Sequence, residues 1–214
     1  MARADLPLPT PKSRRRREEL LVAAQKTFER LGYFETRASD IAKAAGVALG
    51  TFYSYFDSKD HVLRELIDVL AEDLSTASAV GIVGQKTPLA TMQVTIRAFI
   101  YAYRDRAALI AVLEQATASN DEFLHIRLQI RQRFGAQLET ELRRQLASHP
   151  SSPKKGGKPA RRLDPKIGAY ALGGMVEDFA RGCYILGVLV DEDLAIDTLA
   201  LIWIRSIGPA DTSV

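Results

Sequence analysis

The 214-residue sequence predicts an all-α protein of about nine helices, and three observations lead to this prediction. Apolar residues recur every three or four positions along most of the chain, which is the spacing of one helical face. Capping residues and prolines stand where helices would begin, and glycines stand where some of them would end. No segment alternates apolar and polar residues as a half-exposed strand would.

The first part of the chain is predicted to hold a basic arm and four helices. Residues 1–12 contain three prolines and show no helical period, so we expect a disordered arm there. Ser13 is suited to cap the first helix, and Gly32 is suited to end it in the left-handed conformation. Gly46 marks a turn between two short helices, and Ser58 caps a longer one. The expected helices span residues 13–32, 39–45, 49–56 and 58–78.

Five further helices are expected in the rest of the chain. The first begins at Thr87-Pro88, a cap followed by proline at the first helical position. The stretch 148–163 is rich in serine, proline, glycine and lysine and is predicted to be a flexible loop. The other four helices are expected over residues 106–118, 120–147, 165–190 and 191–207.

The charge is distributed unevenly, although the formal net charge is only +3. Residues 1–17 and 148–166 each carry six Lys or Arg against one acid, whereas residues 167–214 carry two against seven. Such asymmetry suits a protein that presents one face to a polyanion such as nucleic acid. The alternative interpretation is a solubilising tail.

We see no signal for secretion or for membrane insertion in this sequence. No apolar segment follows the basic N-terminal residues, and the uncharged run from Gly182 to Val190 is far shorter than the ~20 residues of a membrane-spanning helix. The single cysteine, Cys183, cannot form an intrachain disulfide, which fits a reducing compartment. We therefore expect a soluble, cytoplasmic protein with no membrane partner.

Residues 31–63 carry the pattern that is most informative about function. Two short helices separated by a glycine turn form a helix-turn-helix. Ile41, Ala42 and Ala45 are expected to face inward, and the alanines permit close approach of the two helices. Gly46 supplies the positive φ of the turn. The second helix is short enough to enter a DNA major groove about 12 Å wide.

A series of motifs at fixed spacings runs through this stretch: Gly32-Tyr33, Thr36, Asp40-Ile41-Ala42, Ala45-Gly46-Val47, Gly50-Thr51-Phe52-Tyr53, Tyr55-Phe56 and Ser58-Lys59. The series resembles the N-terminal signature of the TetR family of transcriptional regulators, without a gap, over about residues 14–66. Three positions depart from the family pattern. Ala48 stands where a capping Ser or Thr is usual, Arg37 where a second Thr is frequent, and His61 where an acid usually completes a capping box. We therefore expect no capping box at His61.

The resemblance implies which residues contact DNA. Thr36 and the nearby backbone would bind phosphate at the start of the second helix, and Lys59 would hold phosphate at a helix start unless it is an ordinary solvated lysine. Arg37 would either contact DNA or pair with Asp40. The run 14–17 of four arginines would attract phosphate or act as a minor-groove arm, unless it is a solvated helix start. Leu49, Gly50 and Thr51 would approach base edges, Tyr53 and Tyr55 would reach phosphate or base unless Tyr53 only packs, and Phe52 and Phe56 would be core.

The resemblance also implies two roles for residues 61–208, behind a DNA-binding domain at 13–60. The last two helices would form a homodimer through Met175, Phe179 and Trp203, unless these residues pack inside the monomer. The helix that starts at Ser58 would be the only link between the domains and would carry the effector signal. An effector pocket would be lined by Phe99, Tyr103, Leu109, Leu113 and Phe179, with Tyr103, Gln115 and Asn120 as polar anchors, unless these residues are plain core.

The expected function is that of a repressor that binds a pseudo-palindromic operator in double-stranded DNA as a homodimer. A small apolar effector would release it. The alternative is a DNA-organising or interaction protein that uses the same helix-turn-helix without a ligand. Catalysis is disfavoured because His61, His125 and His149 are far apart and no metal-binding or phosphate-binding motif occurs. We expect no metal, no cofactor and no enzymatic activity.

Overall fold

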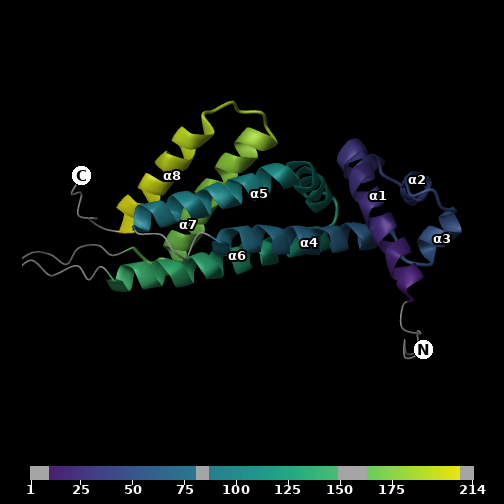
Figure 1. Ribbon diagram of the computed structural model, residues 1–214, viewed down its shortest axis with the longest axis horizontal. Helices are drawn as coiled ribbons and strands as arrows, with labels where there is room; N and C mark the ends of the chain where they lie inside the picture. The colour runs from purple at the N-terminus through teal and green to yellow at the C-terminus, as the bar shows by residue number, and fades with distance from the viewer. Residues whose placement is uncertain (1–9, 81–86, 149–162, 208–214) are drawn as a thin grey trace, which may run out of the picture. The chain divides into compact units, whose positions relative to one another are not determined.

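The computed structural model describes residues 10–80, 87–148 and 163–207, and within these ranges every regular element is a helix. The prediction of an all-α fold is therefore confirmed (Figure 1). The eight helices are α1 (Pro11–Glu35), α2 (Ala38–Ala44), α3 (Leu49–Tyr53), α4 (Lys59–Val80), α5 (Pro88–Thr117), α6 (Asp121–Ser148), α7 (Pro165–Tyr184) and α8 (Glu192–Ile207).

The described ranges hold eight helices rather than nine because two of the expected helices are one. Helix α5 continues through Arg104, Asp105 and Arg106, where we expected a new helix to begin. This segment contains neither glycine nor proline, and Arg104 and Asp105 keep their charges in water, so nothing stops the helix there. Helix α7, by contrast, ends before the expected Val190, in a loop where Gly187 adopts a φ of 77°.

Helix α1 begins earlier than expected, because Thr10 rather than Ser13 caps it. The side chain of Thr10 accepts a hydrogen bond from the backbone N–H of Ser13 at 3.2 Å, and Pro11 follows the cap. Residues 11 and 12 of the expected disordered arm are therefore helical, and residues 1–9 lie outside the described ranges. Gly32 adopts the expected left-handed φ of 77°, but helical structure resumes beyond it and reaches Glu35.

The chain divides into two compact units. Unit 1 consists of Met1–Leu70 and Ala108–Phe123, and unit 2 consists of Ala71–Ala107 and Leu124–Val214. The chain therefore passes from one unit to the other three times, within α4, α5 and α6. The bounds of these units differ from the expected division between residues 60 and 61, and the helix after the helix-turn-helix is one of three connections between them.

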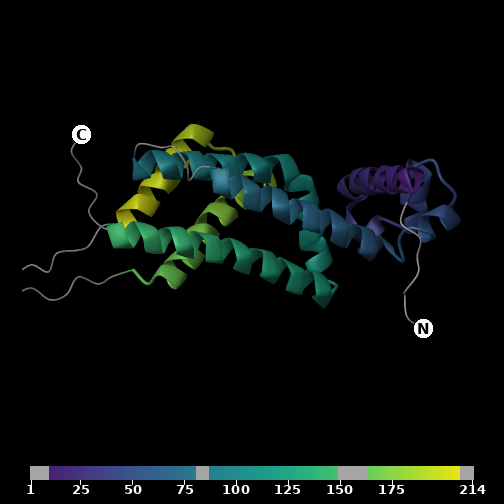
Figure 2. The ribbon, with the colours of Figure 1, turned by 60° about the horizontal axis from the view of Figure 1, so that its bottom comes forward.

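Unit 1 contains the helix-turn-helix. Helix α2 contacts both α1 and α3, and the three lie side by side in two views (Figures 1 and 2). The unit also includes the part of α5 that follows Ala107, which we had assigned to the helical body. Its fully buried side chains include Leu20, Phe28, Ile41, Phe52, Phe56, Ile67 and Phe123.

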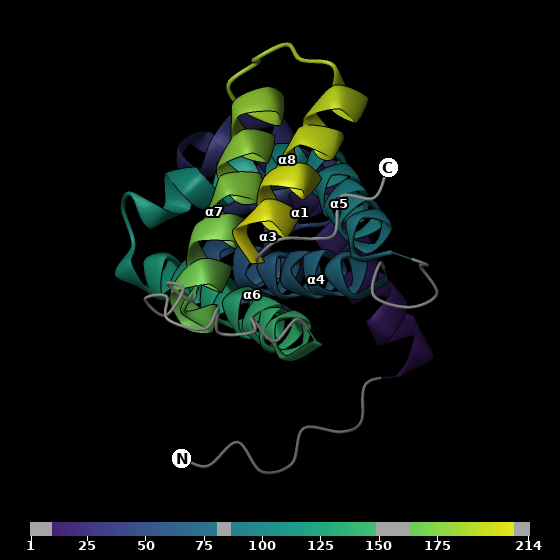
Figure 3. The same ribbon diagram turned by 90° about the vertical axis from the view of Figure 1, so that its left-hand side faces the viewer.

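Unit 2 contains the remaining helices, with α7 and α8 running side by side in opposite directions (Figure 3). Helix α7 packs closely on α6 because glycines face it: a Cβ on Gly173 would lie 2.7 Å from Leu138. The expected flexible loop 148–163 lies almost entirely outside the described residues. No helix in the described ranges is long and apolar enough to cross a membrane.

Candidate nucleic-acid interface

The turn between α2 and α3 sets the geometry of the helix-turn-helix. Gly46 adopts a φ of 66°, as expected for the left-handed turn, and a Cβ there would meet nothing within 4 Å. The N–H of Val47 donates to the carbonyl of Ala42 at 3.0 Å and closes the turn. Ile41 and Ala42 are buried as expected, whereas Ala45 is only partly buried.

Helix α3 has one buried face and one exposed face. Phe52 is fully buried, and Phe56 just beyond the helix is buried beside it, with ring centroids 5.8 Å apart. On the other side, 43% of Leu49 and 54% of Tyr53 are exposed, and Thr51 and Tyr55 are half-buried. The predicted base-contacting residues therefore lie on the side of the helix that the protein leaves open.

Gly50 is the most informative residue of this face. A Cβ built on Gly50 would meet nothing within 4 Å, and the residue is exposed within a regular helix. Glycine destabilises a helix interior relative to alanine by roughly 0.5–1 kcal/mol. Packing within the protein thus gives no reason for glycine here. A partner surface that approaches the backbone closely would give one.

The hydroxyl of Thr36 is engaged within the chain. Its side chain is only 1% exposed, and its hydroxyl donates to the carbonyl of Gly32 at 2.7 Å. The hydroxyl therefore closes the end of α1, so any phosphate contact at this position would fall to the backbone.

Arg37 keeps an exposed side chain at the start of α2. The carboxylate of Asp40 accepts a hydrogen bond from the backbone N–H of Arg37 at 3.0 Å, which caps the helix. Among the described residues, no ion pair joins this carboxylate to the Arg37 guanidinium. The guanidinium of Arg37 is therefore accessible to an anion such as a DNA phosphate, which favours DNA contact over pairing with Asp40.

Lys59 lies at the end of α1, although α4 carries it. Its ammonium donates to the carbonyl oxygens of Tyr33 at 2.6 Å and Thr36 at 2.9 Å, and it lies 4.4 Å from the centroid of the Tyr33 ring. Burial lowers the pKa of Lys59, while the carboxylates of Asp60 and Glu35 act in the opposite direction. The expected phosphate ligand thus caps backbone carbonyls of its own chain.

Tyr33 joins three segments of unit 1. Its hydroxyl donates to Asp60 at 3.0 Å, and its backbone N–H donates to the side-chain oxygen of Gln115 at 2.8 Å. Burial raises the pKa of Tyr33, and the neighbouring carboxylate of Asp60 raises it further. A Cβ on Gly32 would lie 2.7 Å from the same Gln115 oxygen. Gln115, an expected effector anchor, therefore holds the bend in α1.

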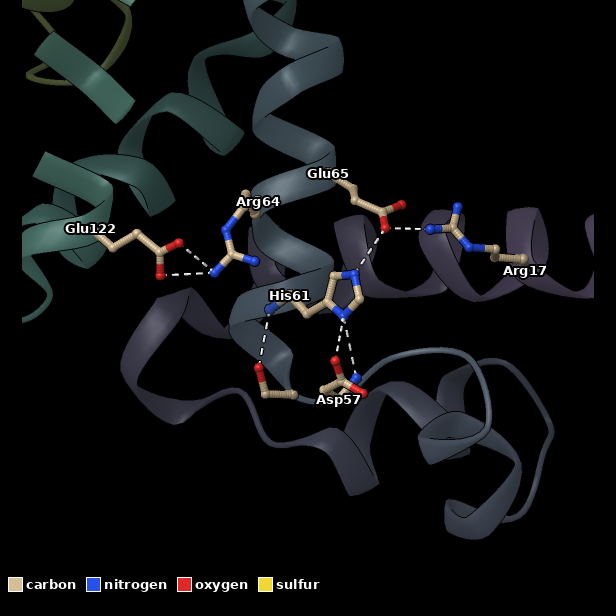
Figure 4. A network of polar contacts seen from close by, with 7 residues as sticks. Arg17, Asp57, His61, Arg64, Glu65 and Glu122 are labelled. Carbon is tan, nitrogen blue, oxygen red and sulfur yellow. Dashed lines mark hydrogen bonds and ion pairs between the residues drawn. The ribbon is translucent and has the colours of Figure 1, made fainter. Parts of the chain in front are cut away.

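His61 replaces the acid of a capping box. Its Nδ1 accepts a hydrogen bond from the backbone N–H of Asp57 at 3.3 Å, while Ser58 Oγ accepts one from the N–H of His61 at 3.1 Å (Figure 4). Because this N–H belongs to Asp57 and not to the N-cap residue Ser58, the contact is not a capping box, and the expectation that none forms at His61 agrees with the described contacts. The His61 Nε2 lies 3.2 Å from Glu65.

Arg17 extends this network to α1. Its guanidinium pairs with Glu65 and lies 4.9 Å from the centroid of the Phe56 ring (Figure 4). Arg15 and Arg16 pair with Glu19 at 3.2 and 2.8 Å. Of the four arginines expected to attract phosphate, three therefore have carboxylate partners within the chain, and Arg14 is exposed.

A small cavity of about 20 Å³ lies inside unit 2, and only one predicted pocket residue lines it. That residue is Phe99. Leu109 and Leu113 are buried in unit 1, and neither Tyr103 nor Phe179 lines the cavity. Asn120, an expected anchor, accepts a hydrogen bond from the N–H of Glu122. The residues that line the cavity are Met92, Thr95, Ile96, Phe99, Phe134, Leu138, Gly173, Val176 and Trp203.

The three predicted dimer residues differ in burial. Trp203 is 2% exposed, and Met175 and Phe179 are half-buried. The interpretation that Trp203 packs inside the monomer is therefore the correct one. Apolar side chains that are exposed on the same two helices include Ile167, Tyr170, Leu194, Leu201 and Ile202.

Comparison with known sequences places the first unit in a family. Residues 20–66 match the model of the bacterial regulatory proteins of the tetR family. The HTH-type transcriptional regulator EthR of Mycolicibacterium smegmatis is 41% identical over 28% of this chain and 32% of its own. The HTH-type transcriptional repressor KstR2 of Rhodococcus jostii is 28% identical over 60% of each chain. The chain therefore matches about a third to three-fifths of the length of these relatives.

Comparison with solved structures extends the likeness to the whole fold. NalD of Pseudomonas aeruginosa, the secondary repressor of the MexAB-OprM multidrug efflux pump, superimposes with a TM-score of 0.65 at 20% identity, over 92% of this chain and 98% of its own. The open face of α3 and this all-helical fold define a helix-turn-helix regulatory protein. Residues 20–66 thus carry the domain of the tetR family of bacterial regulatory proteins, and the chain as a whole shares the fold of such regulators.

No cluster of three metal-ligating side chains occurs in the part of the chain that the structure describes.

Proposed function

We propose that the protein is a dimeric repressor that binds a pseudo-palindromic DNA operator through α3. The observation that carries this proposal is the exposed face of α3, where Gly50 has open space in front of its backbone. The side chains of Leu49, Thr51 and Tyr53 surround it and would contact base edges or phosphate. Arg37, with its exposed guanidinium, would hold phosphate. Action on chromosomal DNA implies the cytoplasm as its compartment.

A second copy of the chain would supply the second half-site. One short recognition helix covers few base pairs, so useful specificity requires two helices at a fixed spacing. The exposed apolar side chains of α7 and α8, which include Ile167, Tyr170, Leu194 and Ile202, would form the dimer face together with the half-buried Met175 and Phe179, whereas Trp203 is buried.

Release from the operator would follow binding of a small apolar effector in unit 2. The apolar cavity there supports this role, and α4 and α5 each run from unit 2 into the unit that holds the recognition helix. A regulator of this kind requires a ligand with different affinities for the DNA-competent and DNA-incompetent shapes. The alternative, a DNA-organising protein without a ligand, requires no such difference.

The experiment is a comparison of Gly50→Ala with Gly135→Ala. A Cβ at either position meets nothing within 4 Å, so both variants should fold and gain helix stability. An operator selected from random duplexes is then titrated in a mobility-shift assay. We expect Gly50→Ala to weaken binding at least tenfold and Gly135→Ala to leave it unchanged. Equal operator affinity in both variants would contradict the assignment of α3 as the recognition helix.

A further inference from the structure

Trp203 buries a hydrogen-bond donor without an acceptor. The side chain lies on α8 and is 2% exposed, yet its indole Nε1–H has no partner in the described ranges. Leaving a buried donor unpaired costs free energy that a hydrogen bond would recover. A native protein that keeps such a group requires an explanation, and an absent ligand is one.

The same side chain lines the cavity of unit 2, whose described walls carry no charged group. Helix α5 contributes Met92, Ile96 and Phe99, and α6 and α7 contribute further apolar residues. Thr95 is the polar member of the lining, and its hydroxyl already donates to the carbonyl of Thr91 at 2.9 Å. A carboxylate in these surroundings would be desolvated without a cation to compensate it, which disfavours an anionic ligand.

We propose that the cavity binds an uncharged, mainly apolar molecule with one acceptor oxygen, such as a ketone or an ester, and that the Trp203 Nε1–H donates to that oxygen. This rests on the proposed role of unit 2 as an effector-binding unit, and it specifies the chemistry of the effector. The cavity of about 20 Å³ is too small for such a molecule. The surface that the cavity exposes is apolar, so its walls, which include the rings of Phe99 and Phe134 stacked at 5.1 Å, have to move on binding to make room and to bring the oxygen to the Nε1–H. The bound shape then differs from the empty one.

Trp203 is the only tryptophan of the chain, which makes the test specific. Acetophenone and α-methylstyrene have nearly the same shape, but only acetophenone carries an acceptor oxygen. Both are titrated into the full chain without DNA. Their affinities are measured by calorimetry, and the indole N–H is followed by its single ¹H–¹⁵N cross-peak. We expect acetophenone to bind roughly fivefold more tightly than the hydrocarbon, the order of one buried hydrogen bond. It should also shift the indole proton downfield.

Trp203→Phe keeps an aromatic ring but removes the donor, so it should abolish the preference for the ketone. Equal affinities in the wild type, a preference that persists in Trp203→Phe, or no binding of either compound would overturn the proposal. If the variant does not fold, an unshifted indole resonance in ketone-saturated wild type overturns it as well. These titrations contain no DNA, so a negative result does not affect the assignment of α3 as the recognition helix. In the same way, a protein that fails to bind an operator can still give a positive result in the ligand titrations.

Discussion

The ammonium of Lys59 lies 2.6 Å from the carbonyl oxygen of Tyr33, so the first residue of α4 caps the last turn of α1. Thr36 provides a second carbonyl at 2.9 Å, and that of Phe34 lies at 3.4 Å. Three acceptors match the three N–H groups of an ammonium. This contact fixes the segment that leads from α1 into the helix-turn-helix.

Lys59→Ala should therefore lower folding stability more than it alters the salt dependence of DNA binding. The loss of charged hydrogen bonds should reduce the free energy of unfolding by about 1.5–3 kcal/mol. Urea denaturation measures this loss, and the slope of operator affinity against salt concentration counts the phosphate contacts. Lys43→Ala, which removes an exposed lysine of α2, is the control. A slope reduced by about one with unchanged stability would instead identify Lys59 as a phosphate ligand.

Arg17 and Arg14 should behave differently although both belong to the basic run. Arg17 covers Phe56 and pairs with Glu65, so Arg17→Ala should destabilise unit 1 by about 0.5–1 kcal/mol. Arg14 is exposed, so Arg14→Ala should leave stability unchanged and weaken binding to operator and random DNA equally. Thermal unfolding and fluorescence titration measure the two effects. Equal changes in folding stability and in DNA affinity in the two variants would contradict this difference between Arg17 and Arg14.

Glu141 should make unit 2 sensitive to acid. Burial opposes its ionisation, but hydrogen bonds from Arg144 and Gln145 outweigh this effect, and the pKa of Glu141 falls below 4.5. A folded-state pKa below the unfolded one stabilises the protein above pH 4.5, and that stability is lost as the pH falls through the folded value. Glu141→Gln should thus unfold more readily than the wild type at pH 7.

The difference in urea midpoint between the wild type and Glu141→Gln should become smaller below pH 4.5, because protonation of Glu141 then removes the same ion pair from the wild type. Urea midpoints measured between pH 7 and pH 3 test this. Glu139→Gln, which removes the carboxylate that pairs with Arg143 at 2.6 Å, is the control for charge alone. If the difference in urea midpoint between the wild type and Glu141→Gln did not change with pH, stabilisation by the ionised Glu141 would be excluded.

Leu194→Asp should produce monomers. Leu194 is 66% exposed on α8, and a charge there would be buried if a second copy covered this face. We expect the dimer dissociation constant to rise at least tenfold, which is about 1.4 kcal/mol, and operator affinity to fall with it. Sedimentation velocity measures the oligomeric state. Leu128→Asp, at an exposed leucine of α6, should leave the dimer intact. Dimers in both variants would place the interface on another surface.

Local features of the site could be predicted from the sequence. The positive φ of Gly46 and the burial of Phe52 and Phe56 follow from residues a few positions apart, because a turn and a helical period fix them. The open face of α3 follows from the same period. The sequence also predicts the all-α class, since each helix carries its own apolar stripe.

Contacts between distant segments could not be predicted in this way. The resemblance implies a phosphate contact for Lys59, and nothing near this residue in sequence shows that the end of α1 meets its ammonium. Gln115 meets Tyr33 across 82 residues. Leu109 and Leu113 have the same apolar spacing as pocket residues, and only the tertiary fold places them in unit 1. The contact of His61 with the backbone N–H of Asp57, four residues earlier, could have been inferred, because an imidazole nitrogen accepts hydrogen bonds.

Because the chain passes three times between the two units, the recognition helix cannot be transferred to another protein as one continuous segment. A fragment cut after Leu70 would carry the recognition helix but would lack Ala108–Phe123, and with it the side chains of Gln115 and Phe123 that meet Tyr33. Such a fragment is an incomplete folding unit. A chimera that gives this recognition helix to a relative therefore has to exchange two segments, 1–70 and 108–123, together. Substitutions in the second segment should coevolve with those around Gly32 rather than with the cavity of unit 2.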